Sequence, residues 1–491
     1  MNLERRMCGA ALVLVACGSG AESSDTDGST TGSTGPATGD TGTPTTGSTT
    51  ATTDDKGVVC PTCAGTCDLR AADGGNPAWA LLCGSAVDEA QARVAATGSG
   101  SLTVVFELGH AADKQVSLAL GQTFVEAGQG DAIVARLGAG GALEWSQAWS
   151  GPGFARPQAA AGSAAGRFAA FIGASDVTTI GAEVVTCPGE CGVIAVLGPD
   201  GVLAWQRSYQ GANYAFGLAI GPSGEVAVAG AYAGATDFGA GPVSSSGSEP
   251  FVTVHEVDGT LRFARTYLSA GGEAASIAFA ADGSLVIGGT FSKSIALGDP
   301  ALVADDNATF VARLAPTGET LWARQFDSPG AFDHQIKRVV IDSAGNIGIA
   351  GTFIGRLNLG GVDLDNADPA QVEDPNYDVF VAGLDPAGTH LWSARLGDEE
   401  NDDRIAGLDV AEPLGLQVAW AGETSGSRLD RFDGAGVSLA SVVVDVPGLH
   451  SAARDVDGTM MLAGSHAGPF DLLGPWTPAG EQDLWVTRIL P

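Results

Sequence analysis

Four short apolar segments recur in a fixed order about every 60 residues along most of this chain. In the clearest copy, the first segment is FVARL at 310–314 and the second begins at Trp322. A weaker third segment covers 336–342, and the fourth, IGIAGTF at 347–353, leads into an L-x-L-G tail at 357–360. This repeat constrains the fold strongly, because every copy must take the same structure and pack against its neighbours.

The recurring segments have the properties of β-strands. Each is short, apolar or alternating, and bounded by turn residues, as at 198–201 (GPDG) and 385–388 (DPAG). The 72 glycines suit many tight turns, because glycine adopts positive φ angles without steric cost. Four short strands per repeat predict an all-β chain in which each repeat is one blade of a β-propeller.

The number of copies predicts seven blades. The first segment occurs near residues 132, 193, 251, 310, 379, 428 and 484. The series opens with a second-type strand at Trp79 and closes with a first-type strand at 484–489. We therefore expect a single seven-bladed propeller closed by strand exchange between the termini, which leaves no open sheet edge. The order of the strands from the centre outward stays open.

Residues 310–360 resemble the SBBP-type repeats, a bacterial family of seven-bladed β-propellers. The resemblance rests on FVARL-x-P-x-G-x-x-LW followed by D-x-x-G-N-x-x-x-x-G-T-F. It covers most of residues 75–491, is clear from 193 to 400, and is decayed elsewhere. It implies the fold and brings no catalytic residues.

The aromatic residues that open the second segments form a second pattern. Asp200-Gly201 before Trp205, and Thr317-Gly318 before Trp322, are similar to the tryptophan-docking motif of quinoprotein-type propellers. That group includes the lipoprotein scaffold of the β-barrel assembly machine. Its repeats are near 40 residues, so the longer period here argues against membership. We expect these aromatic residues to pack blade against blade, rather than to stack on a ligand.

The N-terminus has the features of an export signal. Two arginines precede an apolar stretch at 7–16 that is too short to span a bilayer. The stretch ends in LVAC at 14–17, which resembles the lipobox of bacterial lipoproteins. That resemblance implies a signal peptide over 1–16, a Cys17 carrying acyl chains such as palmitate, and, because residue 18 is Gly, an outer-membrane location facing the cell surface or the periplasm. The alternative is an ordinary secretory signal with a chance cysteine.

The predicted anchor is followed by a segment that cannot fold alone. Residues 18–56 are almost entirely Ser, Thr, Gly, Asp, Ala and Pro, which bury little apolar surface. We expect lipidated Cys17 and a disordered linker over 17–56, a Cys-rich segment over 57–76, and the propeller over 77–491. The net charge of -33 repels nucleic-acid phosphates and anionic lipid head groups, so we expect no nucleic-acid partner and membrane contact through the lipid alone.

Six further cysteines predict disulfides, because an even set in an exported chain is typically paired. They are Cys60, Cys63, Cys67, Cys83, Cys187 and Cys191. The last two are close enough to bridge locally. The other four allow three pairings, and we expect Cys83 to tie the Cys-rich segment to the first blade. A thioredoxin-type redox pair in CPTC and a four-cysteine zinc site are disfavoured by the absence of a βαβ pattern and by the oxidising compartment.

Two acidic segments contain candidate calcium ligands, because Ca²⁺ prefers carboxylate oxygens. The candidates are Asp363, Asp365, Asp368, Asp398 and Asp402. Neither segment has the full EF-hand pattern, so solvated acidic loops are favoured over metal sites; we expect no other cofactor. Asp131 with Arg136, and Asp483 with Arg488, share a spacing and a repeat position, which we interpret as ion pairs within blades.

No pattern in the sequence predicts catalysis. The six histidines are scattered, and neither a paired metal motif nor a nucleophile elbow is present. The leading hypothesis is a non-catalytic binding or scaffold module with an unidentified protein or glycan partner, bound through the segments that differ most between repeats: 181–192, 239–250, 298–309 and 361–378. The alternatives are a secreted propeller enzyme, such as a glycan lyase or hydrolase, and an envelope-assembly scaffold resembling the β-barrel machine's lipoprotein.

Overall fold

The computed structural model describes the chain in segments between residues 64 and 489, and these segments form β-strands and turns. No helix long and apolar enough to cross a membrane occurs in them. The described ranges are 64–71, 79–84, 89–98, 100–109, 117–327, 333–366, 376–397, 402–422, 426–444, 446–466, 470–471, 475–476 and 483–489.

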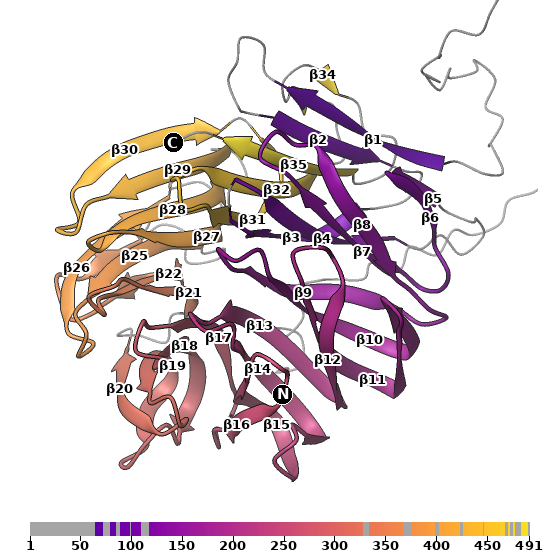
Figure 1. The fold of residues 1–491 in the computed structure, drawn as a ribbon. Helices are drawn as coiled ribbons and strands as arrows, with labels where there is room; N and C mark the ends of the chain where they lie inside the picture. The colour runs from indigo at the N-terminus through magenta and orange to yellow at the C-terminus, as the bar shows by residue number, and fades with distance from the viewer. Residues whose placement is uncertain are drawn as a thin grey trace, which may run out of the picture. The chain divides into compact units, whose positions relative to one another are not determined.

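Seven antiparallel blades surround a central axis, which confirms the predicted seven-bladed β-propeller (Figure 1). From the axis outward, the blades are β3 (Glu89–Ala96), β4 (Leu102–Leu108), β7 (Asp131–Leu137), β8 (Leu143–Trp149); β9 (Ala155–Gly162), β10 (Phe168–Ile180), β11 (Glu183–Leu197), β12 (Leu203–Gln210); β13 (Ala212–Ile220), β14 (Val226–Asp237), β15 (Pro242–His255), β16 (Leu261–Thr266); β17 (Gly272–Phe279), β18 (Leu285–Ile295), β19 (Leu302–Leu314), β20 (Thr320–Phe326); β21 (His334–Ile341), β22 (Ile347–Phe353), β25 (Asp378–Leu384), β26 (His390–Leu396); β27 (Asp403–Ala411), β28 (Gly415–Gly422), β29 (Gly426–Phe432), β30 (Ser438–Val444); and β31 (Leu449–Arg454), β32 (Met460–His466), β35 (Asp483–Ile489), β2 (Trp79–Gly84).

The order of strands within a blade explains their sequence patterns. The weak third segment is innermost, followed by the fourth and the first, and the aromatic second segment is outermost. The two middle strands lie between neighbouring blades on both faces, so β22 and β25 are buried along their whole length. Strands buried on both faces read as continuous apolar runs, whereas the outer β26 mixes buried and exposed positions.

The ring closes by strand exchange between the two ends of the chain, as predicted. The C-terminal β35 lies between β32 and the N-terminal β2, with Trp485 opposite Leu82 and Val486 opposite Ala463. Trp485 is fully buried, and its indole N–H donates to the Pro447 carbonyl oxygen at 2.9 Å. The last blade is therefore built from strands separated by most of the sequence.

The closing blade extends beyond four strands. β1 (Ala64–Ala71) pairs antiparallel with β2 and parallel with β5 (Ser117–Leu120), which pairs in turn with β6 (Gln122–Val125). The predicted Cys-rich segment, 57–76, is not separate from the propeller, because its residues 64–71 form a strand of the closing sheet. These eight residues, AGTCDLRA, are mostly small or polar and match none of the four repeat segments, so their pairing could not be seen in the sequence.

Aromatic side chains join the outer parts of neighbouring blades. The indole N–H of Trp145 donates to the Pro199 carbonyl oxygen at 3.0 Å, and that of Trp205 donates to Val257 at 3.1 Å. Each acceptor lies in the turn between the third and fourth strands of the next blade. These contacts confirm that the recurring aromatic residues pack between blades.

A glycine in the same turn makes room for each aromatic ring. A Cβ atom on Gly201 would lie 2.7 Å from the Trp145 ring, and one on Gly388 would lie 2.7 Å from the Trp322 ring. Both glycines have positive φ, +78° and +77°. This position of the turn therefore requires glycine for two reasons: its backbone is left-handed, and the aromatic ring leaves no room for a Cβ atom. The same contact recurs at Gly259, Gly318 and Gly436.

One junction between blades lacks this contact. The residue of β30 at the aromatic position is Ala440, which lies opposite Arg431 as Trp392 lies opposite Gly383. The next blade is the closing one, where the third and fourth strands, β35 and β2, come from opposite ends of the chain. No turn joins those strands, so the blade has no turn glycine on which an aromatic ring could dock.

The expected pairs of Asp131 with Arg136 and Asp483 with Arg488 are wrong. Arg136 pairs with Glu144 at 2.7 Å, and Arg488 pairs with Asp457 at 2.9 Å. Residues five apart in a strand project from opposite faces of the sheet, so their side chains cannot meet. A shared spacing was mistaken for proximity.

We predict that Gly388→Ala destabilises the propeller more than Gly234→Ala does. Gly234 has a similar φ of +74°, but a Cβ there meets nothing within 4 Å, so that variant measures the backbone cost alone. The clash with Trp322 adds about 1–3 kcal/mol of overpacking to Gly388→Ala. Urea unfolding of the two variants and the parent checks this. Equal losses of unfolding free energy would show that the ring contact contributes nothing.

Candidate functional site

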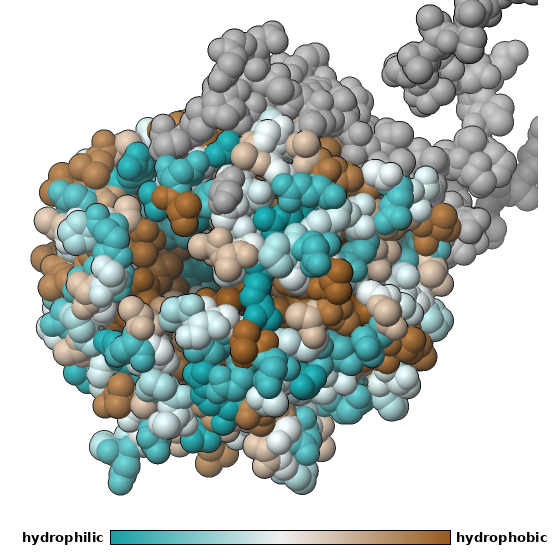
Figure 2. Space-filling view, viewed as in Figure 1, coloured by the Kyte–Doolittle hydropathy of each residue, from teal (hydrophilic) through white to brown (hydrophobic). Residues whose placement is uncertain are grey.

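The seven innermost strands line a channel along the propeller axis. Its cavity volume is about 730 Å³, and each of the seven blades contributes residues to its wall. Figure 2 shows a hollow on one face of the ring, with hydrophilic and hydrophobic residues at its mouth. The channel is a concave feature to which all seven blades contribute, so its side chains define the candidate site.

Every inner strand carries a β-bulge at the same place. In β21 the register shifts between Ile336 and Arg338, and in β17 it shifts between Ala274 and Ser276. The other five inner strands shift at the equivalent position. A bulge redirects the side chains around it, so this position decides what each blade places in the channel.

Two blades place an arginine where the others place a small residue. The first paired residue after the bulge is Arg93 in β3 and Arg338 in β21. The equivalents are Ala159, Gly217, Ser276, Gly407 and Ser451. Five small residues keep the channel open, and the two arginines are therefore departures from the repeat.

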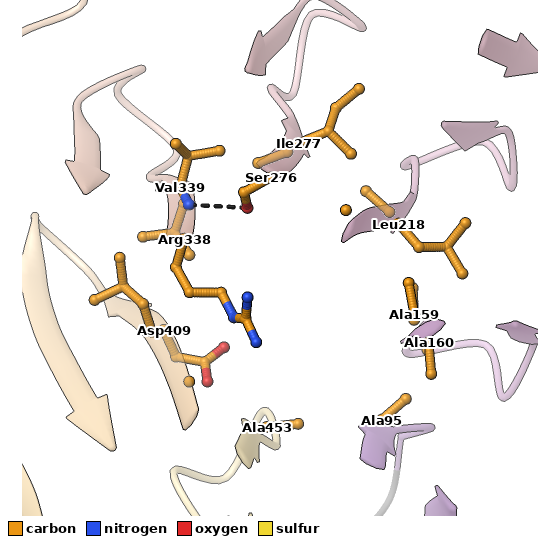
Figure 3. Close-up of a pocket in the computed structure, with 18 of the residues that line it drawn as sticks. Ala95, Ala159, Ala160, Leu218, Ser276, Ile277, Arg338, Val339, Asp409 and Ala453 are labelled. Atoms are coloured by element: carbon orange, nitrogen blue, oxygen red, sulfur yellow. Dashed lines mark hydrogen bonds between the residues drawn. The ribbon is translucent and has the colours of Figure 1, made fainter. Parts of the chain in front are cut away.

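Polar side chains near the bulges join neighbouring inner strands. The Ser276 hydroxyl accepts a hydrogen bond from the Val339 backbone N–H at 3.0 Å (Figure 3), and Ser451 accepts one from Val94 at 3.1 Å. Gln158 Oε1 accepts from the Ala215 N–H at 2.8 Å. These bonds fix the strands that carry the arginines, so the wall of the channel is rigid.

Arg338 and Asp409 project into the channel from neighbouring strands, as Figure 3 shows. Burial raises the pKa of Asp409 to about 7, against the opposing pull of the Arg454 charge, the Arg454 backbone N–H and the Arg338 charge. Burial also lowers the pKa of Arg338, and the negative charge of Asp409 opposes that effect. Both residues are partly exposed to the channel, so their charges interact across a confined space with only partial screening by water.

Arg93 continues the charged group onto β3. Its Nε donates to the Gln158 carbonyl oxygen at 3.0 Å, and one Nη donates to that of Ala92. Burial lowers the pKa of Arg93 to about 10, with a further contribution from the positive charge of Arg338. Nearby, burial and the Arg93 charge lower the pKa of His450 to about 4, so this histidine is neutral at pH 7.

Three of the candidate calcium ligands, Asp363, Asp365 and Asp402, lie among the described residues, and each contacts a protein donor. Asp365 pairs with Arg356 at 2.7 Å, and Asp363 lies 3.7 Å from the same guanidinium. Asp402 Oδ1 accepts from the Tyr377 backbone N–H. Asp368 and Asp398 lie outside the described residues. In the part of the chain that is described, no group of three or more His, Cys, Asp or Glu side chains is placed to hold a metal ion.

Two cysteines of the predicted set, Cys187 and Cys191, form a disulfide within β11. Cys83 is also disulfide-bonded, and the pairing of β1 with β2 places Cys67 directly opposite it. Cys17, Cys60 and Cys63 lie outside the described residues.

Three of the segments expected to be variable loops are β-hairpins. In the second, third and fourth blades the two middle strands continue beyond the sheet, as β10 and β11 do on either side of the turn at Gly181. Each extension begins at a bulge with a left-handed residue: Asp176, Gly234 or Lys293. In the fourth segment, β23 (Arg356–Leu357) pairs with β24 (Leu364–Asp365), and residues 367–375 lie outside the description. In the extension of β10 and β11, burial alternates over a few residues, with Ile180 and Val185 buried and Thr179 exposed. So short an alternation among Thr, Gly and Glu residues gives only a weak strand signal.

The channel residues Arg93, Arg338, Asp409 and Arg454 were not among the predicted site residues. They lie in the innermost strands, which have the weakest pattern of the four. A signal was nevertheless present. Aligning the repeats on their inner strands places Arg93 and Arg338 in a column of Ala, Gly and Ser.

Comparison with known proteins identifies no relative by sequence: no family model and no curated protein matches the chain. Similar solved structures include a protein of unknown function from Bacteroides caccae (13% identity, TM-score 0.33, covering 56% of this chain and 79% of that one). Another is a GH93 α-L-arabinofuranosidase from Fusarium graminearum (10% identity, TM-score 0.39, covering 82% of this chain and 93% of that one). A third is the Dos1 propeller (10% identity, TM-score 0.37, covering 82% of this chain and 92% of that one). At this level of similarity they indicate no function for this chain.

We predict that Asp409 makes stability fall as the pH rises. Its pKa in the folded protein, about 7, lies above the value near 4 of an unfolded chain, so the folded state binds the proton more tightly. The stabilisation is complete below about pH 4 and is lost as the pH rises through about 7. The Asp409→Asn variant escapes this loss.

Urea unfolding at pH 5 and pH 8 measures the effect. The free energy of unfolding of Asp409→Asn, relative to the parent, should rise between the two pH values by on the order of 1–2 kcal/mol. Parallel pH profiles for parent and variant would contradict it.

Proposed function

We propose that this chain is a lipid-anchored binding propeller of the bacterial outer membrane, and that it does not act as an enzyme. The observation that carries the proposal is the channel, a preformed cavity of about 730 Å³ with rigid walls and a small number of charged groups. Ligand sites typically combine a concave surface with a few fixed polar groups. The ligand would be bound in place, and the anchor would hold the propeller at the membrane.

The N-terminal sequence supports a display role. The lipobox-like LVAC at 14–17 is followed by the Ser/Thr/Gly-rich segment 18–56. A flexible coil of about 40 residues spans ~35 Å on average, which would hold the propeller clear of the bilayer. The hairpin extensions of the second, third and fourth blades give a second surface, where an unidentified protein or glycan partner would meet the propeller.

We predict that Cys17→Ala releases the protein from the membrane fraction. Without the Cys17 thiol no acyl chain can be attached, and no described segment is a helix long enough to hold the chain in a bilayer. Cys8→Ala is the matched control, because this cysteine lies inside the predicted signal peptide and should leave fractionation unchanged. Fractionation and labelling with a palmitate analogue measure both variants. Unchanged membrane association of Cys17→Ala would refute the anchor.

One observation favours the alternative of a glycan hydrolase. Asp409 has a pKa near 7, which is the value that a general acid needs at neutral pH. Glycosidases typically use two carboxyl groups across the scissile bond. The other carboxylate of the channel wall, Glu273, lies 3.8 Å from Lys337 Nζ, which ties it to an ion pair.

We predict no turnover of arabinan, polygalacturonate or peptidoglycan by the purified protein. Asp409 has no free carboxylate partner in the channel wall for acid–base chemistry. Release of reducing ends, compared between the parent and Asp409→Asn, checks this. Activity in the parent that Asp409→Asn abolishes would establish the hydrolase and overturn the binding proposal.

A further inference from the structure

The channel reverses the charge of the molecule that surrounds it. The whole chain carries a net charge of -33. The channel wall, by contrast, contains four cationic side chains, Arg93, Lys337, Arg338 and Arg454, against the carboxylates of Glu273 and Asp409. The chain as a whole has 24 basic and 57 acidic residues, so a surface with more basic than acidic side chains differs from the rest of the molecule.

The cationic groups occupy one side of the channel. Arg338, Asp409, Arg454 and Arg93 come from the four consecutive inner strands β21, β27, β31 and β3. The opposite side, formed by β9, β13 and β17, presents mainly small and apolar residues, including Ala159, Ala160 and Leu218 (Figure 3). The channel is therefore amphipathic across its width.

The guanidinium groups of this wall are incompletely bonded. Arg338 donates one hydrogen bond, to the carbonyl oxygen of its own neighbour Lys337 at 2.9 Å. Arg454 Nε is buried and makes no hydrogen bond with any residue that the structure describes. Each guanidinium has five N–H donors, so the wall holds unused donors directed at a shared space.

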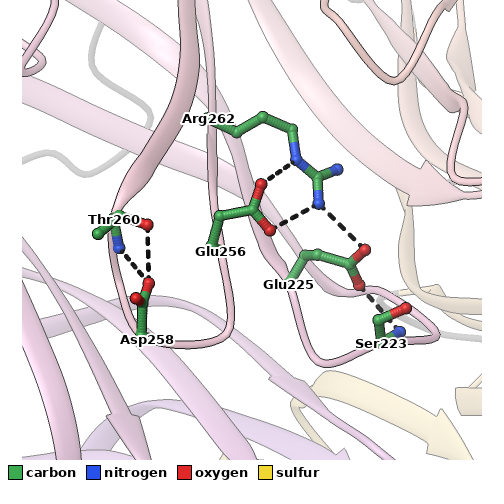
Figure 4. A network of polar contacts seen from close by, with 6 residues as sticks. All are labelled: Ser223, Glu225, Glu256, Asp258, Thr260 and Arg262. Atoms are coloured by element: carbon green, nitrogen blue, oxygen red, sulfur yellow. Dashed lines mark hydrogen bonds and ion pairs between the residues drawn. The ribbon is translucent and has the colours of Figure 1, made fainter.

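An arginine outside the channel shows what full pairing looks like in this protein. Arg262 binds Glu256 with two hydrogen bonds of 2.7 and 2.9 Å and reaches Glu225 at 3.1 Å (Figure 4). Of the two carboxylates in the described channel wall, Glu273 pairs with Lys337 and Asp409 lies near the arginines, where burial disfavours its ionised form. Holding several cations in a confined space without carboxylate partners is costly, and a bound anion removes that cost.

We infer that the channel binds a small anionic ligand, whose carboxylate or phosphate group is held by Arg338 and Arg454 together with Arg93. The inference rests on the proposed binding function and adds the chemical class of the ligand. The planar guanidinium matches both anions with paired hydrogen bonds. The uncharged body of the ligand would lie against Ala159, Ala160 and Leu218. An acidic sugar and a phosphorylated small molecule share this chemistry.

Calorimetry with matched probes tests the inference on the full-length protein in nonionic detergent. The probes are galacturonate with neutral galactose as its control, and glycerol 3-phosphate with neutral glycerol as its control. We expect at least one anionic probe to bind and both neutral probes to fail. Which anion binds more tightly distinguishes a carboxylate from a phosphate ligand.

Three variants connect binding to the channel. Arg338→Gln should lower the affinity for the anionic probe by roughly tenfold or more, because it removes a charge-assisted contact. Asp409→Asn should tighten binding or leave it pH-independent between pH 6 and 8, because it removes the one carboxylate near the arginines. Arg356→Gln changes the net charge by the same amount as Arg338→Gln, but on an exposed hairpin, and should bind like the parent.

The inference fails if no anionic probe binds, if a neutral probe binds equally well, or if Arg356→Gln weakens binding as much as Arg338→Gln. If Arg338→Gln does not fold, two other variants carry the same test. Arg454→Gln should weaken binding of the anionic probe, and Asp409→Asn should strengthen it. Fractionation of Cys17→Ala tests the membrane anchor without any ligand. Binding of a neutral sugar in the channel would refute the anionic class of ligand but would leave the proposed binding function intact. Failure of this inference is therefore distinguishable from failure of the proposed function.

Discussion

The contact between an aromatic ring and a turn glycine in the next blade is the interaction on which the architecture depends. A single blade cannot cover both faces of its sheet, so its stability comes from its neighbours. At Trp205 three interactions act together: the indole N–H binds a turn carbonyl, the ring covers Gly259, and Arg207 lies 5.8 Å above the ring. The contact fixes the spacing of blades at their outer rim and thus leaves the centre to small residues.

The placement of the aromatic contacts at the outer rim explains why the centre of the ring contains a channel. Because bulky rings set the distance between blades at the periphery, the inner strands need no large side chains to hold the ring together. They are joined by hydrogen bonds that backbone N–H groups donate to the side chains of Ser276, Ser451 and Gln158. Positions near the axis are then free to carry charge. Under physiological salt, where the Debye length is about 8 Å, the acidic exterior is largely screened from a distance, whereas a ligand inside the channel meets the arginines directly.

The features that could be predicted from the sequence are those that bulk or repetition makes visible. Trp145, Trp205 and Trp322 recur beside turn glycines, so both the blades and their packing could be anticipated. Arg338 and Asp409 could not, because an inner strand that faces a channel has neither a continuous apolar run nor a clean alternation. The hairpin of β10 and β11 was expected as a loop for a related reason: its buried residues Ile180 and Val185 stand among Thr, Gly and Glu and form no long alternation. Asp131 and Arg136 were expected to pair because their spacing recurs in the repeat. They cannot pair, since side chains five residues apart in a strand project from opposite faces.

The closing blade gives the molecule an order in time. Its third strand, β35, follows every other described strand of the propeller in the sequence, and its neighbour β2 is among the first. Six blades can form from the residues between these two strands, yet the ring stays an open arc until β35 has been made. A chain that stopped just before β35 would hold nearly all of the propeller in folded blades and still expose two sheet edges. Closure of the ring therefore depends on synthesis of all seven blades.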